Sequence, residues 1–300
     1  MQGQSFLISN NADTFMQKAR SLRLSARKLA NSFSAGSFRS LMKGHGIELN
    51  GVREYLYGDD VRAIDWNVTA RMGKPFVKVF EEEHEMQVFF VIDKSLSMFS
   101  GTAKKSRYDV AKELCALLTL ASELHASSVG AVFFDGEIQT SFEPQQGSER
   151  TMLMLSKLSE ENCVQKNGSA LSLALNGAAN LLKKTSFVFV LSDFRTTNYI
   201  KGLARLSQKH DVLAIRITDE SDSALPELGS LPFIDVETKE IKVFPTNTSR
   251  FRNAWRDENR SRLEQWKNQC LRHGVLPLTV STEEDAAKVL IDFFSQKGKA

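Results

Sequence analysis

Short hydrophobic runs alternate with amphipathic segments along residues 86–217 of the chain. Met86–Ile92 (MQVFFVI) and Phe187–Leu191 are hydrophobic almost throughout, as is typical of strands buried on both faces of a parallel sheet. Val212–Ile217 is a further run of strand length. Alternation of such strands with helices predicts a Rossmann-like α/β fold, in which helices cover both faces of a central, mostly parallel sheet.

One pair of runs predicts an antiparallel edge to this sheet. Ser128–Phe134 and Glu137–Ser141 have strand character and are separated by Asp135-Gly136, a strong signal for a two-residue hairpin turn. The edge hairpin therefore follows the first helix of the predicted α/β core.

Hydrophobic residues at three- and four-residue steps predict helices between and around these strands. The expected helices are residues 13–33, 108–124, 149–158, 169–183, 197–208, 250–273 and 283–295, with a hairpin at 232–244 and a strand at 275–280. Residues 36–75 contain six glycines and are expected to be irregular. We predict three parts: a basic N-terminal helix with a glycine-rich segment (1–80), an α/β core (81–225), and a hairpin with a C-terminal α/β extension packed on the core (226–300).

Composition agrees with a folded protein and limits its partners. Of 300 residues, 42% are hydrophobic and 25% are charged, with a net charge of +3, as in ordinary globular proteins. Residues 1–75 hold 11 Lys and Arg against 6 Asp and Glu. Nucleic-acid binding through this basic third is one alternative, but the basic residues are scattered and no reading motif is present. A basic helix at 13–33 could also lie on a membrane, although docking against its own domain or a partner is favoured.

The cysteines and the lengths of the hydrophobic runs indicate the cellular compartment of the protein. Cys115, Cys163 and Cys270 are odd in number and form no CxxC pair, which favours reduced thiols in the cytoplasm. The five histidines show no zinc-ligand spacing. The longest hydrophobic runs are of strand length, far short of a membrane span. We therefore expect a cytoplasmic protein without a membrane-spanning segment.

Oxygen-bearing side chains follow two of the buried strands. Asp93 ends the first strand, with Ser95 and Ser97 at alternate positions after it, and Asp193 ends the strand at 187–191. Alternation in an extended loop points Asp93, Ser95 and Ser97 in one direction. Ligands of open parallel sheets lie outside the carboxyl ends of the strands. Carboxylates and hydroxyls together favour a hard cation, Mg²⁺ or Mn²⁺.

The pattern Asp-x-Ser-x-Ser after a buried strand resembles the metal-ion-dependent adhesion site of von Willebrand factor A domains. The resemblance implies two further ligand positions. One is a threonine in Gly-Thr-x-Leu, and here Gly168-Ser169-Ala170-Leu171 matches it, with Ser169 keeping the hydroxyl but lacking the methyl that restricts the rotamer. The other is an aspartate after a central strand, matched by Asp193. The implied ligands are Asp93, Ser95, Ser97, Ser169 and Asp193.

A second resemblance lies before this site. Gly58-Asp59-Asp60-Val61-Arg62, Ile64-Asp65-Trp66, Ala70-Arg71 and residues 77–83 look like the signature of the bacterial family called domain of unknown function 58. The resemblance implies a von Willebrand factor A-like domain and association with MoxR-type AAA+ ATPases.

The charged residues of this signature are expected to form a network that anchors the N-terminal segment to the sheet, with contact to a partner as the alternative. The network would contain Asp59, Asp60, Arg62, Asp65 and Arg71. Tyr55, Tyr57 and Trp66 are expected to be packing anchors.

An enzymatic function is the main rival. A haloacid dehalogenase-like phosphohydrolase also begins with a strand-terminal aspartate, but its chemistry needs a second carboxylate where this chain has Ser95. The sequence has no G-x-S-x-G elbow and no Walker A loop. We therefore expect a non-catalytic, metal-dependent adaptor or co-chaperone, whose partner offers an acidic side chain to the metal. Lys94 is expected to face solvent and to form a contact rim with Leu96, Met98 and Phe194.

Overall fold

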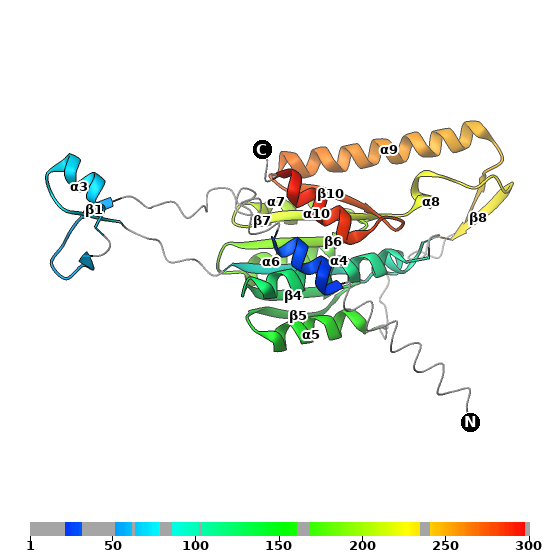
Figure 1. The fold of residues 1–300 in the computed structure, drawn as a ribbon. Helices are drawn as coiled ribbons and strands as arrows, with labels where there is room; N and C mark the ends of the chain where they lie inside the picture. The colour runs from blue at the N-terminus through cyan, green and yellow to red at the C-terminus, as the bar shows by residue number, and fades with distance from the viewer. Residues whose placement is uncertain are drawn as a thin grey trace, which may run out of the picture.

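A computed structural model describes residues 22–31, 52–61, 64–78, 86–101, 104–160, 169–234 and 241–297. Its centre is a six-stranded sheet in the order β10-β7-β6-β3-β4-β5 (Figure 1). The strands are β3 (Gln87–Asp93), β4 (Ser128–Phe134), β5 (Ile138–Gln145), β6 (Ser186–Ser192), β7 (Asp211–Thr218) and β10 (Leu276–Ser281). All pairs are parallel except β4–β5. The predicted mostly parallel sheet with an antiparallel edge hairpin is therefore confirmed.

The turn of the edge hairpin differs in detail from the prediction. Phe134 pairs with Ile138, so the loop holds three residues rather than two. The extra residue is accommodated because the Asp135 side chain accepts a 2.9 Å hydrogen bond from the Glu137 backbone N–H, as short acidic side chains do in turns.

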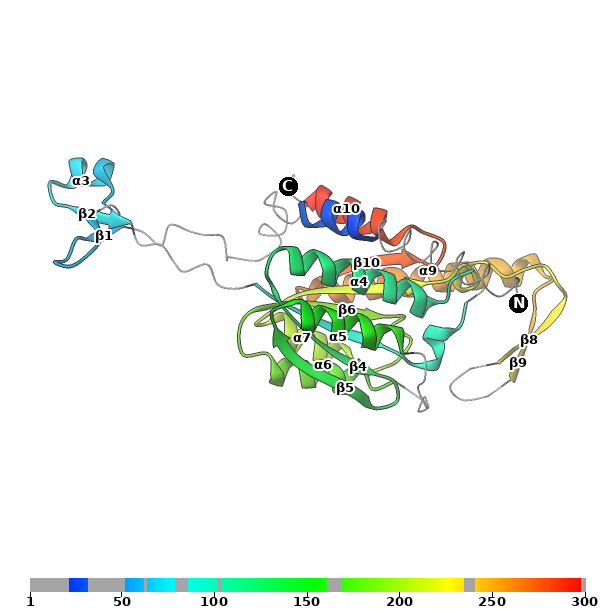
Figure 2. The ribbon, with the colours of Figure 1, turned by 60° about the horizontal axis from the view of Figure 1, so that its bottom comes forward.

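Helices cover both faces of the sheet, as predicted (Figure 2). One face carries α4 (Arg107–Leu124), α5 (Ser148–Ser159), α10 (Ala286–Lys297) and the helix at 22–31. The other carries α6 (Leu171–Leu181), α7 (Ile200–Ser207) and the buried end of α9 (Ser249–Arg272). Successive β3 side chains alternate between these two hydrophobic clusters: Phe90 and Ile92 belong to the first, Phe89 and Val91 to the second.

The basic N-terminal helix docks on its own domain over the residues described. Ala26, Leu29 and Ala30 are buried in the cluster that also contains α4 and α10, and His125 Nε2 lies 2.9 Å from the Ala30 carbonyl oxygen. The predicted start of this helix, Asp13, lies outside the described residues. No helix in the described part of the chain is long and apolar enough to cross a membrane.

Residues 52–61 and 64–78 contain ordered elements that the glycine content did not predict. Short strands β1 (Val52–Glu54) and β2 (Phe76–Lys78) pair antiparallel, and α3 (Trp66–Met72) lies between them in sequence. Three-residue strands are too short for a periodic signal. The prediction of an irregular segment was wrong here.

The charged residues of this unit make local contacts. Asp59 pairs with Arg53 at 2.7 Å, and Asp65 caps α3 by accepting from the backbone N–H groups of Asn67 and Val68. Arg62 lies outside the described residues, so the complete network stays a prediction. Tyr57 and Trp66 are 104% and 67% exposed, so the expectation that they are packing anchors was wrong.

An arm extends beyond the sheet on the right of Figure 1. It contains the short helix α8 (Glu220–Ser223), the hairpin β8 (Ser230–Ile234) with β9 (Ile241–Pro245), and the first half of α9. Phe233, Phe244, Phe251 and Trp255 pack their rings together. This aromatic cluster holds the first half of α9 against the hairpin, while the second half packs on the sheet through Trp266 and Cys270.

Candidate metal site at the sheet edge

The candidate site lies where the direction of strand order reverses. Starting from β3, the chain first adds β4 and β5 on one side and then β6, β7 and β10 on the other. Loops leaving β3 and β6 therefore diverge, and a crevice opens between their carboxyl ends, where ligands of such sheets bind. Asp93 ends β3 and Asp193 directly follows β6.

Asp93, Ser95 and Ser97 lie together at the end of β3, although Ser97 belongs to a 3₁₀ turn and not to the extended loop that the prediction assumed. The Ser95 backbone N–H donates to Asp93 Oδ1 at 2.9 Å, and the two serine Oγ atoms lie 3.2 Å apart. Ser95 stands directly before a 3₁₀ turn, η3 (Leu96–Phe99), which brings Ser97 back toward the strand end. All three side chains are buried. The sequence thus folds locally into a cluster of one carboxylate and two hydroxyls.

Ser169 and Asp193 contribute oxygen atoms that have no hydrogen-bond partner. Ser169 Oγ and Asp193 Oδ2 are both buried and have no hydrogen-bond partner in the described structure, although Arg195 Nε lies 3.6 Å from Asp193 Oδ2. The Ala170 backbone N–H donates to the carbonyl oxygen of Asp135 at 2.5 Å, which holds the loop bearing Ser169 at the end of β4. Buried polar atoms nearly always have a partner. Two oxygens without one, on the same crevice, fit a site that takes a cation.

The two carboxylates are close enough to interact electrostatically. The pKa of Asp93 is raised to about 7, first by burial and then by the charge of Asp193, while hydrogen bonds from Ser192 and Ser95 act in the opposite direction. A divalent cation would remove the repulsion between the two carboxylates. The described residues contain no cluster of three or more His, Cys, Asp and Glu suited to a metal, so a metal here would depend on the hydroxyls.

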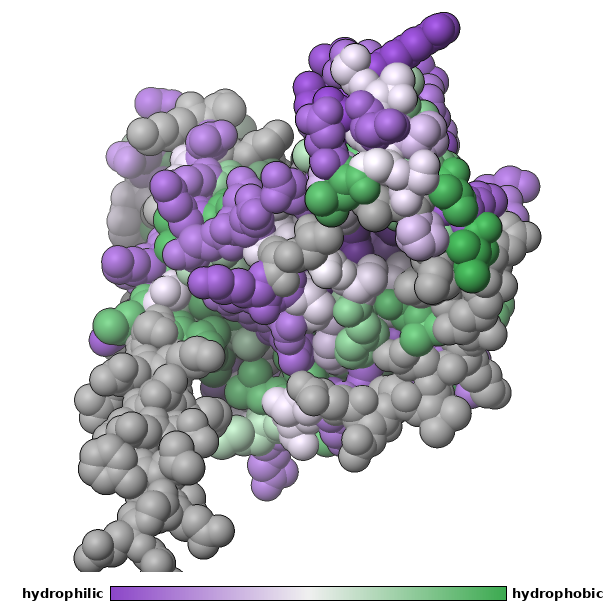
Figure 3. Space-filling model, turned by 90° about the vertical axis from the view of Figure 1, so that its right-hand side faces the viewer, coloured by the Kyte–Doolittle hydropathy of each residue, from purple (hydrophilic) through white to green (hydrophobic). Residues whose placement is uncertain are grey.

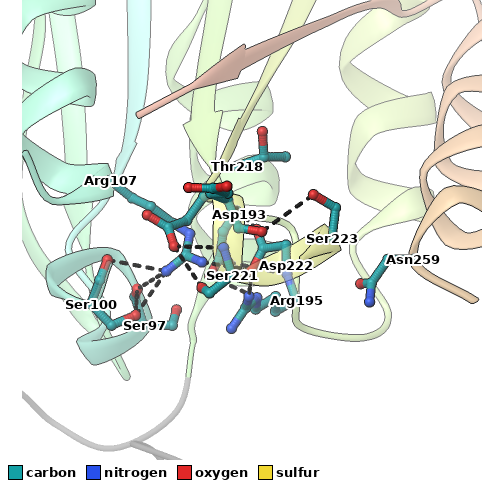
Figure 4. Close-up of polar contacts among 12 residues, drawn as sticks. Ser97, Ser100, Arg107, Asp193, Arg195, Thr218, Ser221, Asp222, Ser223 and Asn259 are labelled. Carbon is teal, nitrogen blue, oxygen red and sulfur yellow. Dashed lines mark hydrogen bonds and ion pairs between the residues drawn. The ribbon is translucent and has the colours of Figure 1, made fainter. Parts of the chain in front are cut away.

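A buried arginine holds the loop of the site in place (Figure 4). Arg107, at the start of α4, donates to the carbonyl oxygens of Ser97 and Ser100 at 3.2 and 3.1 Å, and pairs with Asp222 at 2.7 Å. Arg195 also pairs with Asp222, and its Nε lies 3.6 Å from Asp193 Oδ2. Charged side chains of α4, α8 and the loop after β6 are therefore connected to one another and, through Arg107, to the backbone of η3.

Comparison with known proteins gives the family. Residues 51–265 match the family model described as "Protein of unknown function DUF58". The chain belongs to this family. An uncharacterised protein of Mycobacterium tuberculosis and one of Mycobacterium bovis are each 28% identical to it over 228 residues, covering 75% of this chain and 72% of the relative. The names of these relatives assign them no reaction.

Solved structures resemble this DUF58 chain more distantly. BatB from Bacteroides thetaiotaomicron is 18% identical, with a TM-score of 0.47 over 72% of this chain and 100% of the other. An aerotolerance-related membrane protein from Bacteroides fragilis is 18% identical, with a TM-score of 0.48 over 71% and 98%. The SpRpn10 von Willebrand factor A domain is 11% identical, with a TM-score of 0.40 over 70% and 95%.

The predicted contact rim of the DUF58 site was largely wrong. Lys94 is 4% exposed and donates to the Glu160 carbonyl oxygen at 2.9 Å, over the rings of Tyr108 and Phe133. Met98 and Phe194 are also buried, and Leu96 is half-buried. The side chain of Lys94 does point away from its neighbours, but that direction leads beneath α5 rather than to solvent.

Four residues of the site were missed by sequence reasoning. Ser192 Oγ donates to Asp93 Oδ2 at 2.6 Å, and Arg107, Arg195 and Asp222 form the ion-pair network. Ser192 could have been found, because it ends a buried strand one residue before Asp193. Arg107 and Asp222 stand 115 residues apart, and nothing in the pattern of the sequence pairs them.

A wide cleft extends from the site to α9, with a volume of about 1320 Å³. Its lining includes Ser95, Ser97, Ser169 and Asp193 and residues of α9 such as Asn259 and Trp266. Figure 4 shows Ser97, Asp193 and Asn259 of this lining. Figure 3 views the molecule from the side of the arm, where hydrophilic surface predominates and hydrophobic patches interrupt it. Four of the five candidate ligands, Ser95, Ser97, Ser169 and Asp193, thus line a cleft large enough for part of another protein.

Proposed function

We propose that this DUF58 protein is a non-catalytic, metal-dependent protein-binding adaptor or co-chaperone. Asp93, Ser95, Ser97 and Ser169 would hold Mg²⁺ or Mn²⁺, with Asp193 acting directly or through a water molecule. A carboxylate from a partner would complete the coordination, so that recognition depends on the metal.

The observation that carries this proposal is a pair of buried oxygens without a hydrogen-bond partner, Ser169 Oγ and Asp193 Oδ2, which line the same cleft as Ser95 and Ser97. Leaving a buried polar atom without a partner costs about 1–3 kcal/mol. A cation that accepts both oxygens as ligands would remove that cost. The hydroxyl-rich set matches Mg²⁺, which usually takes only one or two carboxylates and keeps further positions for water or a ligand.

The metal would supply a positive charge at which a partner carboxylate binds, and the chain's own residues would orient it. Hydrogen bonds from Ser95 and Ser192 orient Asp93, while Arg107 fixes the backbone around Ser97. Arg195, ion-paired with Asp193, keeps that carboxylate partly neutralised.

We further propose that the partner is a MoxR-type AAA+ ATPase and that the protein works in the cytoplasm. The assignment of this partner rests on the family resemblance of the motifs at residues 58–71 and 93–97. The compartment is in keeping with Cys115 and Cys270, which are buried free thiols. Binding of a purified MoxR-type ATPase, measured with Mg²⁺ and with chelator, tests the first of these two assignments.

Thermal unfolding with Mg²⁺, Mn²⁺ or chelator tests the metal site itself. A ligand that binds only the folded state raises the midpoint, and at about 100 times its Kd it adds about 2.7 kcal/mol. Asp93→Asn keeps the size of the side chain and removes its charge, so it should abolish the metal-induced rise. Asp257→Asn, on the exposed side of α9, is the matched control and should keep it. Identical melting curves for the wild type in all three conditions would reject the metal site.

A further inference from the structure

We propose that the cleft between the sheet edge and α9 binds an acidic peptide segment of a protein partner, with Arg216 and Trp266 forming a second anchor beside the metal site. The inference deepens the proposed function and rests on it for the first anchor, the metal. The second anchor is argued from groups that the metal site does not use.

Arg216 lies next to the metal site on the neighbouring strand. It pairs in register with Ser192, the residue that hydrogen-bonds Asp93. Its guanidinium stacks over the ring of Trp266 at 5.5 Å from the centroid. Within the described part of the chain no hydrogen bond engages this guanidinium, and its half-buried side chain lines the cleft. Burial lowers its pKa, while the charges of Tyr199, Asp193 and Asp222 act in the opposite direction, and its N–H groups remain available to an anion in the cleft.

Trp266 adds a donor that also lacks an acceptor. Its side chain is 2% exposed, it lines the cleft, and its Nε1–H is buried without a hydrogen-bond partner in the described structure. The Nε1–H of Trp255, which lies nearer the start of α9 and also lines the cleft, is likewise buried without a hydrogen-bond partner in the described residues. Ser169 Oγ and Asp193 Oδ2, at the metal end of the cleft, suit a cation, whereas the two indole N–H groups on α9 suit an anion. Arg107 Nε, also at the metal end, is a further buried donor without a hydrogen-bond partner.

The charges of the cleft favour separated carboxylates over a continuous polyanion. Its lining holds six arginines and five carboxylates, which gives a balance of only +1. Nucleic-acid sites carry a strong excess of positive charge, and the acidic residues of α8 would repel a phosphate backbone. A peptide can place one carboxylate on the metal and another on Arg216, leaving the acidic residues between them uncontacted.

The size of the cleft also points to a peptide. A volume of about 1320 Å³ exceeds the roughly 300–1,000 Å³ of small-molecule pockets. The part of α9 that lines the cleft runs from Trp255 to Gln269, about 22 Å at 1.5 Å per residue. An extended chain of several residues could lie along that wall.

Fluorescence anisotropy with a dye-labelled peptide of alternating glutamate and glycine tests this inference. In Mg²⁺, we expect the wild type to bind this probe and not to bind the matched peptide of alternating glutamine and glycine. Arg216→Gln should weaken binding by about ten-fold, the loss of one charge-assisted hydrogen bond. Trp266→Phe, which keeps a ring and removes the N–H, should weaken it by less. Arg272→Gln, at the end of α9 outside the cleft lining, is the charge-matched control and should bind as the wild type does.

Arg256→Gln provides a second variant on the exposed part of the cleft wall, should Arg216→Gln fail to fold. It should also weaken binding, because Arg256 lines the cleft. Wild-type affinity in both folded cleft variants, or equal binding of the glutamine peptide, would overturn the second anchor.

The metal controls separate this inference from the proposed function. If chelator or Asp93→Asn abolishes binding while Arg216→Gln and Arg256→Gln leave it unchanged, the metal anchor stands and the second anchor is rejected. If binding needs Arg216 but is indifferent to Mg²⁺ and to Asp93→Asn, the second anchor stands and the metal-dependent function is rejected.

Discussion

Ser192 Oγ lies 2.6 Å from Asp93 Oδ2 and donates a hydrogen bond to it. This bond joins the ends of β6 and β3 at the point where the strand order reverses. The same Oγ accepts a 3.0 Å hydrogen bond from the Phe194 backbone N–H. One hydroxyl therefore fixes the orientation of Asp93 and the path of the loop that carries Asp193.

Replacing this hydroxyl should weaken both the fold and the metal site. Ser192→Ala leaves two buried groups without a partner and should cost about 1–3 kcal/mol of unfolding free energy. It also removes a hydrogen bond that lowers the pKa of Asp93, so the proton should compete better and the affinity for Mg²⁺ should fall. Chemical denaturation and calorimetric Mg²⁺ titration measure the two effects.

Ser186→Ala is the matched control for this prediction. Ser186 is a buried serine at the other end of β6 and donates to the Lys184 carbonyl oxygen. Its replacement should lower stability without changing the affinity for Mg²⁺. A Mg²⁺ affinity that stays at the wild-type value in Ser192→Ala would show that this hydroxyl plays no part in positioning Asp93.

The raised pKa of Asp93 predicts a pH dependence with a definite sign. Folding raises this pKa from 3.8 to about 7, which means that the protonated carboxyl favours the folded state. Its contribution to the free energy of unfolding is complete below the pKa of the unfolded state and is lost as the pH rises through about 7. Metal binding needs the deprotonated carboxylate and displaces its proton. The metal-free protein should therefore lose stability between about pH 4 and pH 7, and Mg²⁺ should restore it.

Thermal midpoints with and without Mg²⁺ at pH 6 and pH 8 check this dependence. The rise caused by Mg²⁺ should be larger at pH 8, because apparent affinity changes by up to about ten-fold per pH unit while one proton must leave. Asp93→Asn should remove the difference between the two pH values. A larger effect at pH 6 than at pH 8 would contradict the assignment of Asp93 as a ligand.

The ion pair between Arg107 and Asp222 should be important for stability. The Arg107 side chain is 2% exposed and also donates to the backbone around the site. Removing one partner of a buried pair costs about 3–5 kcal/mol, and we expect Arg107→Met to lie near the lower value because Asp222 keeps Arg195. Denaturant unfolding measures this loss. Lys105→Met breaks the exposed pair with Glu113 and should cost no more than about 1 kcal/mol.

The sheet and the convergence of the candidate ligands could be predicted because both follow from local rules. Buried strands are visible as hydrophobic runs, and parallel strands bring their carboxyl ends to one edge, so Asp93 and Asp193 had to meet there. The contacts of Lys94, Arg107 and Asp222 depend on which distant segment packs against each side chain. Alternation predicted the direction of the Lys94 side chain but not that α5 covers it.

Restoring the threonine expected in the von Willebrand factor A pattern should strengthen metal binding. Ser169 Oγ is buried and has no hydrogen-bond partner in the described structure, so its hydroxyl is free to turn. The β-branched side chain in Ser169→Thr restricts χ1, which should save about 0.5–1 kcal/mol of side-chain entropy and raise the Mg²⁺ affinity roughly two- to five-fold. Ser169→Ala should lower the affinity.

Ser172→Thr, one residue into α6, introduces the same methyl away from the cleft and should leave the affinity unchanged. If calorimetry gives the same Mg²⁺ affinity for the wild type, Ser169→Thr and Ser169→Ala, the hydroxyl of residue 169 does not reach the metal and must be removed from the set of ligands.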